Sequence, residues 1–328
     1  MKKLFALLLI TLTAATLQAA PKKLLVVSVT TGFRHASIPT MEKMLSQLAK
    51  DSGEFTVDFV QQPAGKPAAP KKPAPLKADA LEEQKAAYNA AADKFNHDLA
   101  AFNVAEVKWE QTLAVALEKL SPASLKHYDG VVFASTTGDL PIPNRQGFLD
   151  WIKAGHAFIG LHSATDTFHG WPEFIEMIGG EFQHHGPQVA VECLNQDETH
   201  PATAALGKSW KISQEEIYQF KNYDAAKVHD LLILGQHPEN NSPGHFGVAW
   251  CKDYGQKKSM APRHGAELLM WKPWPSKGGR VFYTSLGHRE DILDADPDLK
   301  DRKNSVAVAK AYQAHVLGGI EWALGLKK

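Results

Sequence analysis

Continuous apolar runs alternate along the chain with stretches that repeat their apolar positions every three or four residues. Residues 23–29 (KLLVVSV) are almost continuously apolar, which is typical of a strand covered on both faces. Residues 39–53 place four apolar side chains on one helical face and end at Gly53. Further strands are expected at 55–60, 129–135, 157–163, 231–236, 247–254 and 279–288, and further helices at 145–155, 171–180 and 304–324. This alternation predicts an α/β fold with a mostly parallel sheet flanked by helices.

Two segments interrupt the alternation. Residues 63–75 (PAGKPAAPKKPAP) predict a stiff linker, because so many prolines exclude a helix or a central strand. Residues 76–120 are rich in Ala, Lys and Glu and predict a helical insertion. One helix of that length would reach about 65–70 Å, more than the width of a domain, so we expect a hairpin that bends near Asn103. The second interruption, 256–277, predicts a long surface loop.

Large apolar side chains recur at every seventh residue of the helical insertion, which lines one helix face and indicates packing rather than a binding site. They are Leu81, Tyr88, Phe95, Phe102 and Trp109. A homo-oligomer or partner contact through these helices is an alternative role for the segment.

The first twenty residues predict a bacterial signal peptide rather than part of the fold. Lys2 and Lys3 precede an apolar stretch at 4–12 and a small-residue cleavage site at 17–19. A membrane anchor is the competing interpretation, but the stretch is short and no other segment approaches about 20 apolar residues. We therefore expect no membrane span, a periplasmic or secreted location, and one domain over 21–328 that 63–75 and 76–120 interrupt.

The charge and cysteine content narrow the function classes. The chain has 36 Lys and Arg against 36 Asp and Glu, so no excess positive charge favours nucleic acid or acidic lipid as a partner. Cys193 and Cys251 both lie in strand-like runs. They are either two buried apolar side chains or one disulfide, and neither lies on a glycine-flanked turn that would expose a nucleophilic thiolate.

Histidines follow three of the predicted strands. In open parallel sheets, ligands bind beyond the carboxyl ends of the strands. His35 comes after such an end, and His162 and His288 stand at the ends of their predicted strands. We therefore expect one site that combines these histidines with other polar side chains of the same edge. The expected additional members are Arg34, Thr137, Asp166, His185, Glu216 and Tyr218.

Two chemistries suit these residues. A divalent metal such as zinc could be bound by His35, His162 and His288, with an open position that activates water or polarises a carbonyl. Alternatively, His and Glu act as acid and base without a metal. The chain contains no HExxH motif, so a metal site would be assembled from distant segments; no nucleotide cofactor is predicted. A serine nucleophile is disfavoured, because the turn 160–164 (GLHSA) places histidine at its apex.

Several segments, in this order, resemble the trehalose-utilisation (ThuA-like) family. They are TGFRHASI, STTGDL, GLHSATDTFHGWPEFIEMIGGEF, FQHH, HPAT, EEIYQF and VAWCKDYG followed by GRVFYTSLGH. The resemblance covers roughly 23–60 and 120–325 and leaves out the insertion. It implies the class I glutamine amidotransferase-like fold, which is a flavodoxin-like arrangement of three layers.

The resemblance also bears on activity. Amidotransferases of this fold carry a cysteine at the position that matches His162, and an imidazole cannot form their thioester, so we expect no glutaminase activity. The family implies a role in sugar catabolism, in places through 3-keto sugars. The positions that match the family pattern are His35, His162, Asp166, His185, Glu216 and His288.

The resulting hypothesis is an exported enzyme that acts on a small sugar, a 3-keto-sugar or a glycoside. Its catalytic residues would be His162, Asp166, Glu216 and His288, with a metal or Arg34 over the carbonyl oxygen. The predicted substrate-binding residues are Arg34, His35, Thr137, Trp171, His185 and Tyr218. Trp171 either stacks on a sugar ring or packs in the core. The alternative is a non-catalytic sugar-binding protein on the same scaffold.

Overall fold

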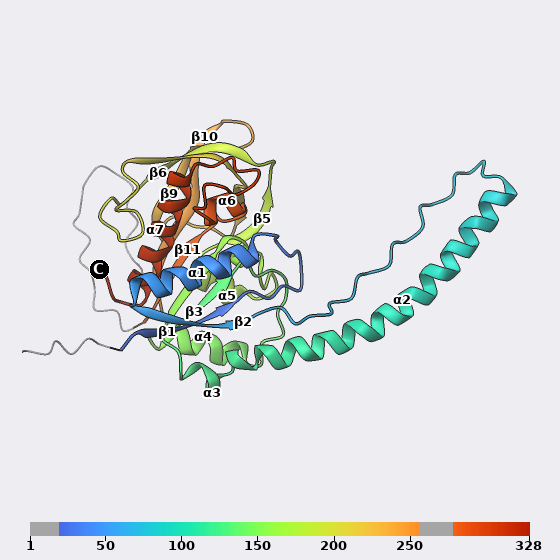
Figure 1. The fold of residues 1–328 in the computed structure, drawn as a ribbon, viewed down its shortest axis with the longest axis horizontal. Coiled ribbons are helices and arrows are strands. Elements are labelled where there is room, and N and C mark those ends of the chain that lie inside the picture. Colours follow the sequence, from blue (N-terminus) through green and yellow to red (C-terminus); the bar gives the residue numbers. More distant parts are fainter. Residues whose placement is uncertain (1–19, 256–277) are drawn as a thin grey trace, which may run out of the picture.

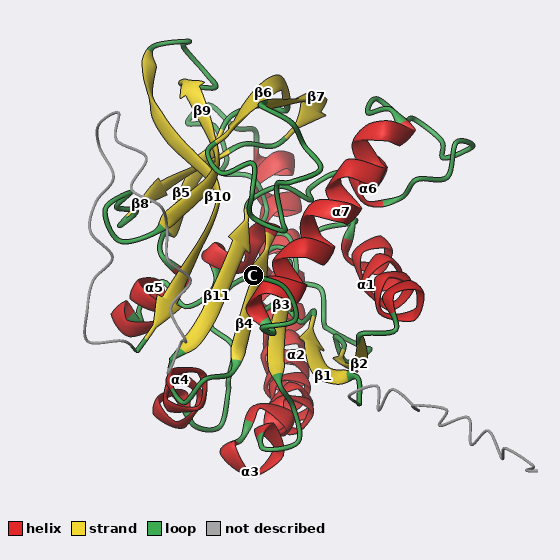
Figure 2. Ribbon diagram, turned by 90° about the vertical axis from the view of Figure 1, so that its left-hand side faces the viewer, coloured by secondary structure: helices red, strands yellow, loops and turns green. Residues whose placement is uncertain are grey.

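The computed structural model describes residues 20–255 and 278–328, so the expected signal peptide and the expected loop 256–277 lie outside the described residues, apart from Ala20. A nine-stranded sheet runs through the molecule in the order β2-β1-β3-β4-β11-β10-β9-β6-β7 (Figures 1 and 2). Its parallel part consists of β1 (Lys22–Val27), β2 (Phe55–Val60), β3 (Gly130–Ala134), β4 (Ala157–Leu161) and β11 (Gly279–Thr284).

The antiparallel part extends the sheet from β11. It consists of β10 (Pro243–Tyr254), β9 (His229–Gln236), β6 (Val189–Asn195) and β7 (Ser209–Glu215). Two further strands, β5 (Glu181–His185) and β8 (Tyr218–Lys221), pair with each other outside this sheet. The antiparallel strands lead the chain back to the carboxyl edge of the parallel strands, where β7 ends next to Glu216.

Helices cover both faces of the sheet (Figure 2). The first layer contains α1 (Ile38–Ser52), α6 (Glu290–Leu293) and α7 (Val306–Ala323), and the second contains α4 (Arg145–Lys153), α5 (Pro172–Ile178) and the end of α2 (Glu82–Leu117). Short helical turns are η1 (Glu118–Leu120), α3 (Pro122–Leu125) and η2 (His162–Asp166).

The continuous apolar run of β1 explains the two layers. Successive side chains of a strand point to opposite faces. Leu24 and Val26 therefore pack in the cluster with α1 and α7, whereas Leu25 and Val27 pack in the cluster with α4 and α5. The predicted α/β fold, with a mostly parallel sheet between helices, is confirmed.

The helical insertion differs from the prediction. Helix α2 is continuous over 36 residues, so the expected hairpin near Asn103 is wrong. The helix does not have to fit the width of the domain, because most of it projects from the body together with the preceding linker (Figure 1). Only its last turns join the core, through Trp109, Leu113 and Leu117. We call residues 63–108 the arm.

The linker and α2 run out along the arm together (Figure 1). At its base the Trp109 indole donates a hydrogen bond of 3.1 Å to the Pro63 carbonyl, and the Lys66 ammonium lies 5.2 Å from the Trp109 ring centre. Beyond the base, half-buried prolines recur every third residue and half-buried aromatic residues every seventh. Three residues of polyproline II advance about 9 Å and seven of an α-helix about 10 Å, so the two periods match. The prolines are Pro67, Pro70 and Pro73, and the aromatic residues are Tyr88, Phe95 and Phe102.

The two cysteines are buried and free, as in the first of the two alternatives. Burial raises the pKa of Cys193 to about 12 and that of Cys251 well above its ordinary value, so both thiols are protonated. Among the described helices, none is long and apolar enough to cross a membrane.

Candidate functional site

Loops after three parallel strands bring three histidines together. His35 follows β1, His162 follows β4 and His288 follows β11, and Glu216 joins them from the turn between β7 and β8. One potential ligand atom from each of these four residues lies within 4.8 Å of all the others. We call His35, His162, Glu216 and His288 the His/Glu cluster. The prediction that histidines from distant segments meet at the carboxyl edge of the sheet agrees with this geometry.

The three imidazole rings contact one another edge to face. The His35 ring centre lies 4.5 Å from that of His162 and 5.3 Å from that of His288, and His162 and His288 are also 5.3 Å apart. The neighbouring rings disfavour a positive charge on His35 and on His162, because protonated imidazoles repel one another.

Glu216 is the carboxylate of the cluster. Its Oε1 lies 3.2 Å from Nδ1 of His288 and 3.8 Å from Nε2 of His162. Its Oε2 lies 3.1 Å from Nδ1 of His185, whose side chain is 43 % exposed, whereas that of Glu216 is 7 % exposed. One carboxylate therefore connects the buried histidines with a histidine that solvent reaches.

His162 has an unusual backbone conformation. It is the residue directly after β4, and its φ of 49° lies in the left-handed region, which non-glycine residues seldom adopt. The sharp turn is fixed from the neighbouring strand, because the Tyr283 hydroxyl donates a hydrogen bond of 2.8 Å to the His162 carbonyl. This turn directs the imidazole to the centre of the cluster.

The hydrogen bonds of the His162 ring determine its tautomer. Nδ1 lies 2.7 Å from the Ser285 carbonyl oxygen, which can only accept, so Nδ1 carries the proton. Nε2 therefore presents its lone pair to the cluster, where the Tyr218 hydroxyl lies 3.2 Å away and can donate to it. A histidine oriented by a backbone carbonyl in this way is typical of metal ligands.

Burial keeps His35 and His162 neutral. It is the largest cause that lowers the pKa of His35 to about 4, and the neighbouring His288 lowers it further. Burial also lowers the pKa of the fully buried His162 well below its ordinary value, with His35 as the next cause. At neutral pH both rings are uncharged, which is the state that a metal ion or a proton-accepting role requires.

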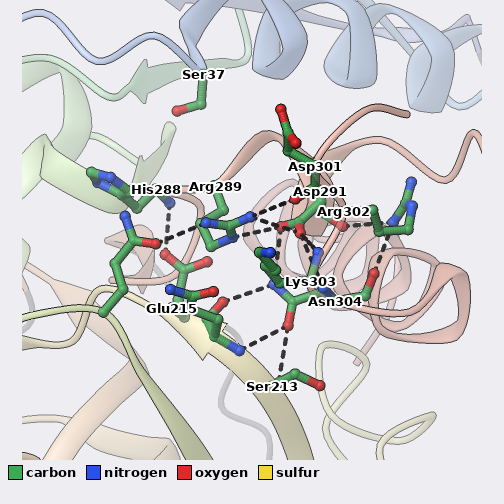
Figure 3. A network of polar contacts seen from close by, with 12 residues as sticks. Ser37, Ser213, Glu215, His288, Arg289, Asp291, Asp301, Arg302, Lys303 and Asn304 are labelled. Atoms are coloured by element: carbon green, nitrogen blue, oxygen red, sulfur yellow. Dashed lines mark hydrogen bonds and ion pairs between the residues drawn. The ribbon is translucent and has the colours of Figure 1, made fainter. Parts of the chain in front are cut away.

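The Glu215 carboxyl connects the backbones of two members of the cluster, Glu216 and His288. Its Oε1 accepts hydrogen bonds from the backbone N–H groups of Glu216, at 3.1 Å, and His288, at 2.9 Å. Burial raises the pKa of Glu215 to about 8. Figure 3 shows this contact beside the Arg289–Asp291 pair, whose two hydrogen bonds are 2.9 and 3.0 Å long. The loop after β11 is therefore held at His288 and directly after it.

Several buried polar atoms near the cluster have no hydrogen-bond partner within the described part of the chain. They are Glu215 Oε2, Ser285 Oγ, and the facing atoms Glu216 Oε1 and His288 Nδ1, which lie 3.2 Å apart without forming a hydrogen bond. Leaving such groups unsatisfied costs about 1–3 kcal/mol each. Their concentration around the His/Glu cluster fits a group that binds there, and imidazole nitrogens with a carboxylate oxygen suit a divalent metal.

Asp166 lies in a second hydrogen-bonded group. Its Oδ1 is 2.7 Å from Nε2 of His169, and Nδ1 of His169 is 2.7 Å from Glu181. Burial is the largest effect on Asp166 and raises the pKa of its carboxyl. For His169, burial lowers the pKa, but the two carboxylates outweigh it and the pKa is raised. His169 therefore favours the protonated form, in which one ring nitrogen donates to Asp166 and the other to Glu181.

Other predicted residues occupy different positions. Arg34 donates a hydrogen bond of 2.8 Å to the Ser28 carbonyl rather than to a member of the cluster. The Trp171 indole is 7 % exposed and packs with Phe168 and Phe174, which corresponds to the core-packing alternative. Thr137 is buried, and its hydroxyl donates to the Phe33 carbonyl at 2.7 Å.

The sequence interpretation noted Glu215 and Ser285 among the polar residues near the predicted site but assigned no role to them, and it assigned none to Phe33. Glu215 stands next to Glu216, both are buried, and the sequence contains no signal that tells the supporting glutamate from the one in the cluster. Ser285 acts through its backbone carbonyl, so its side chain is uninformative. Phe33 lies in the quoted segment TGFRHASI, and its exposure is visible only in the structure.

Comparison with known proteins agrees with this architecture. The profile of the ThuA family, described as trehalose utilisation, matches residues 77–323. The chain belongs to the ThuA family. A search of curated proteins found no match.

Solved structures agree with the family assignment. A ThuA-like protein from Parabacteroides merdae ATCC 43184 superposes with a TM-score of 0.54 at 18 % identity, covering 94 % of this chain and 91 % of that one. One from Bacteroides uniformis ATCC 8492 has a TM-score of 0.51 at 16 % identity, with 94 % of each chain covered. At these identities the likeness shows the fold alone, which is the expected glutamine amidotransferase-like fold.

Proposed function

We propose that this ThuA-family chain is an exported enzyme that acts on a small sugar, a 3-keto-sugar or a glycoside through His/Glu acid–base chemistry, assisted by a divalent metal. The observation that carries the proposal is the His/Glu cluster, with three imidazoles and a carboxylate within 4.8 Å. The family description, trehalose utilisation, supports a carbohydrate as the substrate.

His35, His162 and His288 would hold the metal. Three histidines with one open position form a common donor set of catalytic zinc. The lowered pKa values of His35 and His162 support this role, because neutral imidazoles are ready to ligate. The metal would supply a positive charge over a substrate carbonyl oxygen, in the place for which Arg34 was the other candidate.

Glu216 is the proposed base. A ketone acidifies the neighbouring C–H group, so the Glu216 carboxylate can take that proton while the C–H electron pair forms the C=C bond of an enolate and the C=O π pair moves to the oxygen. The enolate either regains a proton on carbon, which completes an isomerisation, or expels an oxygen substituent on the next carbon. In the second case the departing oxygen leaves with the bonding pair and takes a proton, for which the Asp166–His169 pair is the proposed donor.

A non-catalytic sugar-binding protein is the second candidate. One observation favours it: the His162 side chain is 0 % exposed, so this ring can have a purely structural role. The two candidates differ in what the cluster must do. Binding tolerates the loss of one contact at a cost of about 1–3 kcal/mol, whereas catalysis falls by orders of magnitude when an acid–base group is removed.

The test uses residues 21–328 purified without a histidine tag. Elemental analysis of the wild type, of His162→Ala and of His288→Ala measures the bound metal, with His97→Ala on the exposed surface of α2 as the control. We expect stoichiometric metal in the wild type and the control and its loss in the two cluster variants. A metal-free wild type would contradict the metal-assisted reaction.

The substrate is tested by NMR. The same four proteins are incubated with 3-keto-trehalose and 3-keto-glucosides, and the products are followed over time. We expect conversion by the wild type and His97→Ala, and rates lower by a factor of about 100 or more in His162→Ala and His288→Ala, because losing the metal would remove several kcal/mol of charge stabilisation at the carbonyl oxygen. Binding without conversion over the whole set would favour the non-catalytic alternative.

A further inference from the structure

An aromatic side chain beside the His/Glu cluster is exposed. Phe33 is 67 % exposed, and it is the one aromatic residue among the large exposed apolar side chains of the described residues. Its ring centre lies 4.8 Å from that of His35, at an interplanar angle of 80°. An apolar ring left in water next to the cluster forgoes the stabilisation that burial would provide.

The loop that carries Phe33 is fixed rather than loose. The Thr137 hydroxyl donates to the Phe33 carbonyl at 2.7 Å, and the Thr137 carbonyl accepts the backbone N–H groups of Thr31 at 3.0 Å and Gly32 at 3.4 Å. The exposure of the ring is therefore imposed by the anchored backbone.

Close backbone contact between the two loops explains the glycine at position 138. Gly138 has a φ of +79°, and a Cβ atom there would lie 2.3 Å from the Thr31 hydroxyl and 2.6 Å from the Gly32 nitrogen. Only glycine permits this approach of the β3 loop to the β1 loop. Phe33 and His35, two residues further along, are thus positioned by the same anchored segment.

We propose that Phe33 is a stacking platform for one pyranose ring of the substrate. The C–H groups on the face of a hexopyranose form an apolar surface, which packs on an aromatic face, while the hydroxyl groups point outward. Phe33 contacts the outer side of His35, and His35 contacts His162 and His288, so a ring on Phe33 lies beside the cluster. This inference rests on the proposed function for the reaction, and it adds the residue that selects a cyclic sugar.

Binding and conversion are measured separately. Trehalose and methyl β-D-glucopyranoside serve as binding probes by calorimetry and saturation-transfer NMR, and D-glucitol serves as an open-chain control with similar hydroxyl groups but no ring face. Phe33→Ala removes the platform, and Phe33→Trp keeps an aromatic face. The matched control is Val104→Ala, which truncates another exposed apolar side chain, 74 % exposed on α2. Circular dichroism and metal content check that the variants are folded and loaded alike.

We expect Phe33→Ala to weaken binding of both glycosides by about tenfold, while Phe33→Trp and Val104→Ala bind as the wild type does. Saturation transfer from the Phe33 ring protons should reach the sugar C–H protons, and D-glucitol should show none. Equal affinity in Phe33→Ala and wild type, or no binding of either glycoside by the wild type, would overturn the proposal.

The two proposals fail in different ways. Binding that depends on Phe33, together with a wild type that converts no keto-sugar, keeps the platform and rejects the proposed reaction. Conversion of keto-sugars that is unchanged in Phe33→Ala keeps the reaction and rejects the platform.

Discussion

The backbone N–H of His288 donates a hydrogen bond of 2.9 Å to the buried carboxyl of Glu215, 73 positions earlier in the chain. The same oxygen accepts the N–H of Glu216. One atom therefore joins the loop after β11 to the end of β7, and each of these segments contributes one member of the His/Glu cluster. Side chains that must converge within a few ångströms require such support from the residues behind them.

Replacement of Glu215 tests this support. Glu215→Ala leaves two buried N–H donors unsatisfied, and we expect a loss of about 2–5 kcal/mol in the free energy of unfolding and weaker metal binding. Glu215→Gln retains a carbonyl oxygen as the acceptor and should resemble the wild type in both respects. Urea unfolding and metal titration measure the effects, with the exposed Glu192→Ala as the control. Equal behaviour of the Ala and Gln variants would show that the shared acceptor is unimportant.

The left-handed backbone of His162 makes a second prediction. At ordinary positions Ala is more stable than Gly, but at a φ of 49° the Cβ atom costs about 1–2 kcal/mol. We therefore expect His162→Gly to be at least as stable as His162→Ala in urea unfolding. Ser163 is the control, because it is not among the residues with positive φ in the described part of the chain. There we expect Ser163→Ala to be more stable than Ser163→Gly. A clear advantage of Ala at position 162 would mean that the turn relaxes when the imidazole is removed.

The strand pattern was sufficient to predict the architecture and the meeting of the three histidines. Continuous apolar runs such as residues 23–29 identify strands covered on both faces, and parallel strands end at a common edge. His35, His162 and His288 therefore had to lie near one another once each was placed after a parallel strand. Glu216 reaches the same edge from an antiparallel strand, so the rule for parallel strands does not place it; the sequence offered it as one of the polar side chains expected at the site, and the family resemblance then matched it.

The errors and omissions concern relations that local sequence does not contain. The hairpin expectation assumed that a helix must fit within the domain, whereas α2 extends beyond it together with the proline-rich linker. Trp171 is an aromatic residue of the kind that stacks on sugars, but it packs in an aromatic cluster. The exposed aromatic side chain near the cluster is Phe33 instead. Whether an aromatic side chain is exposed depends on which elements pack over it, which is a tertiary property.

A buried histidine outside the cluster predicts how stability depends on pH. Burial lowers the pKa of His315 to about 4, and its Nδ1 lies 2.8 Å from the Ala202 carbonyl. As the pH falls below about 6.5, the unfolded chain takes up a proton that the folded ring refuses, so stability is lost as the pH falls towards 4. We expect this residue to account for about 2 kcal/mol of the loss between about pH 7 and pH 5.

His315→Gln tests this assignment, because glutamine does not titrate. Its free energy of unfolding, measured in urea across that range, should fall less steeply with acid than that of the wild type. The exposed His97→Gln serves as the control and should keep the wild-type dependence. Identical pH dependence in His315→Gln and wild type would mean that the ring is protonated in the folded protein.

The arm should be separable from the body, provided that its base is kept. Trp109, Leu113 and Leu117 are buried against the sheet, whereas most of α2 before them is exposed. Lys66 already lies against Trp109, so a short Gly-Ser linker can replace residues 67–105, and we expect the melting temperature and the sugar conversion to stay near those of the wild type. Deletion of 63–118 also removes the three buried side chains, each at a cost of roughly 2–5 kcal/mol, and should unfold the protein. If the shorter deletion abolished conversion while the body stayed folded by circular dichroism, the arm would belong to the functional site.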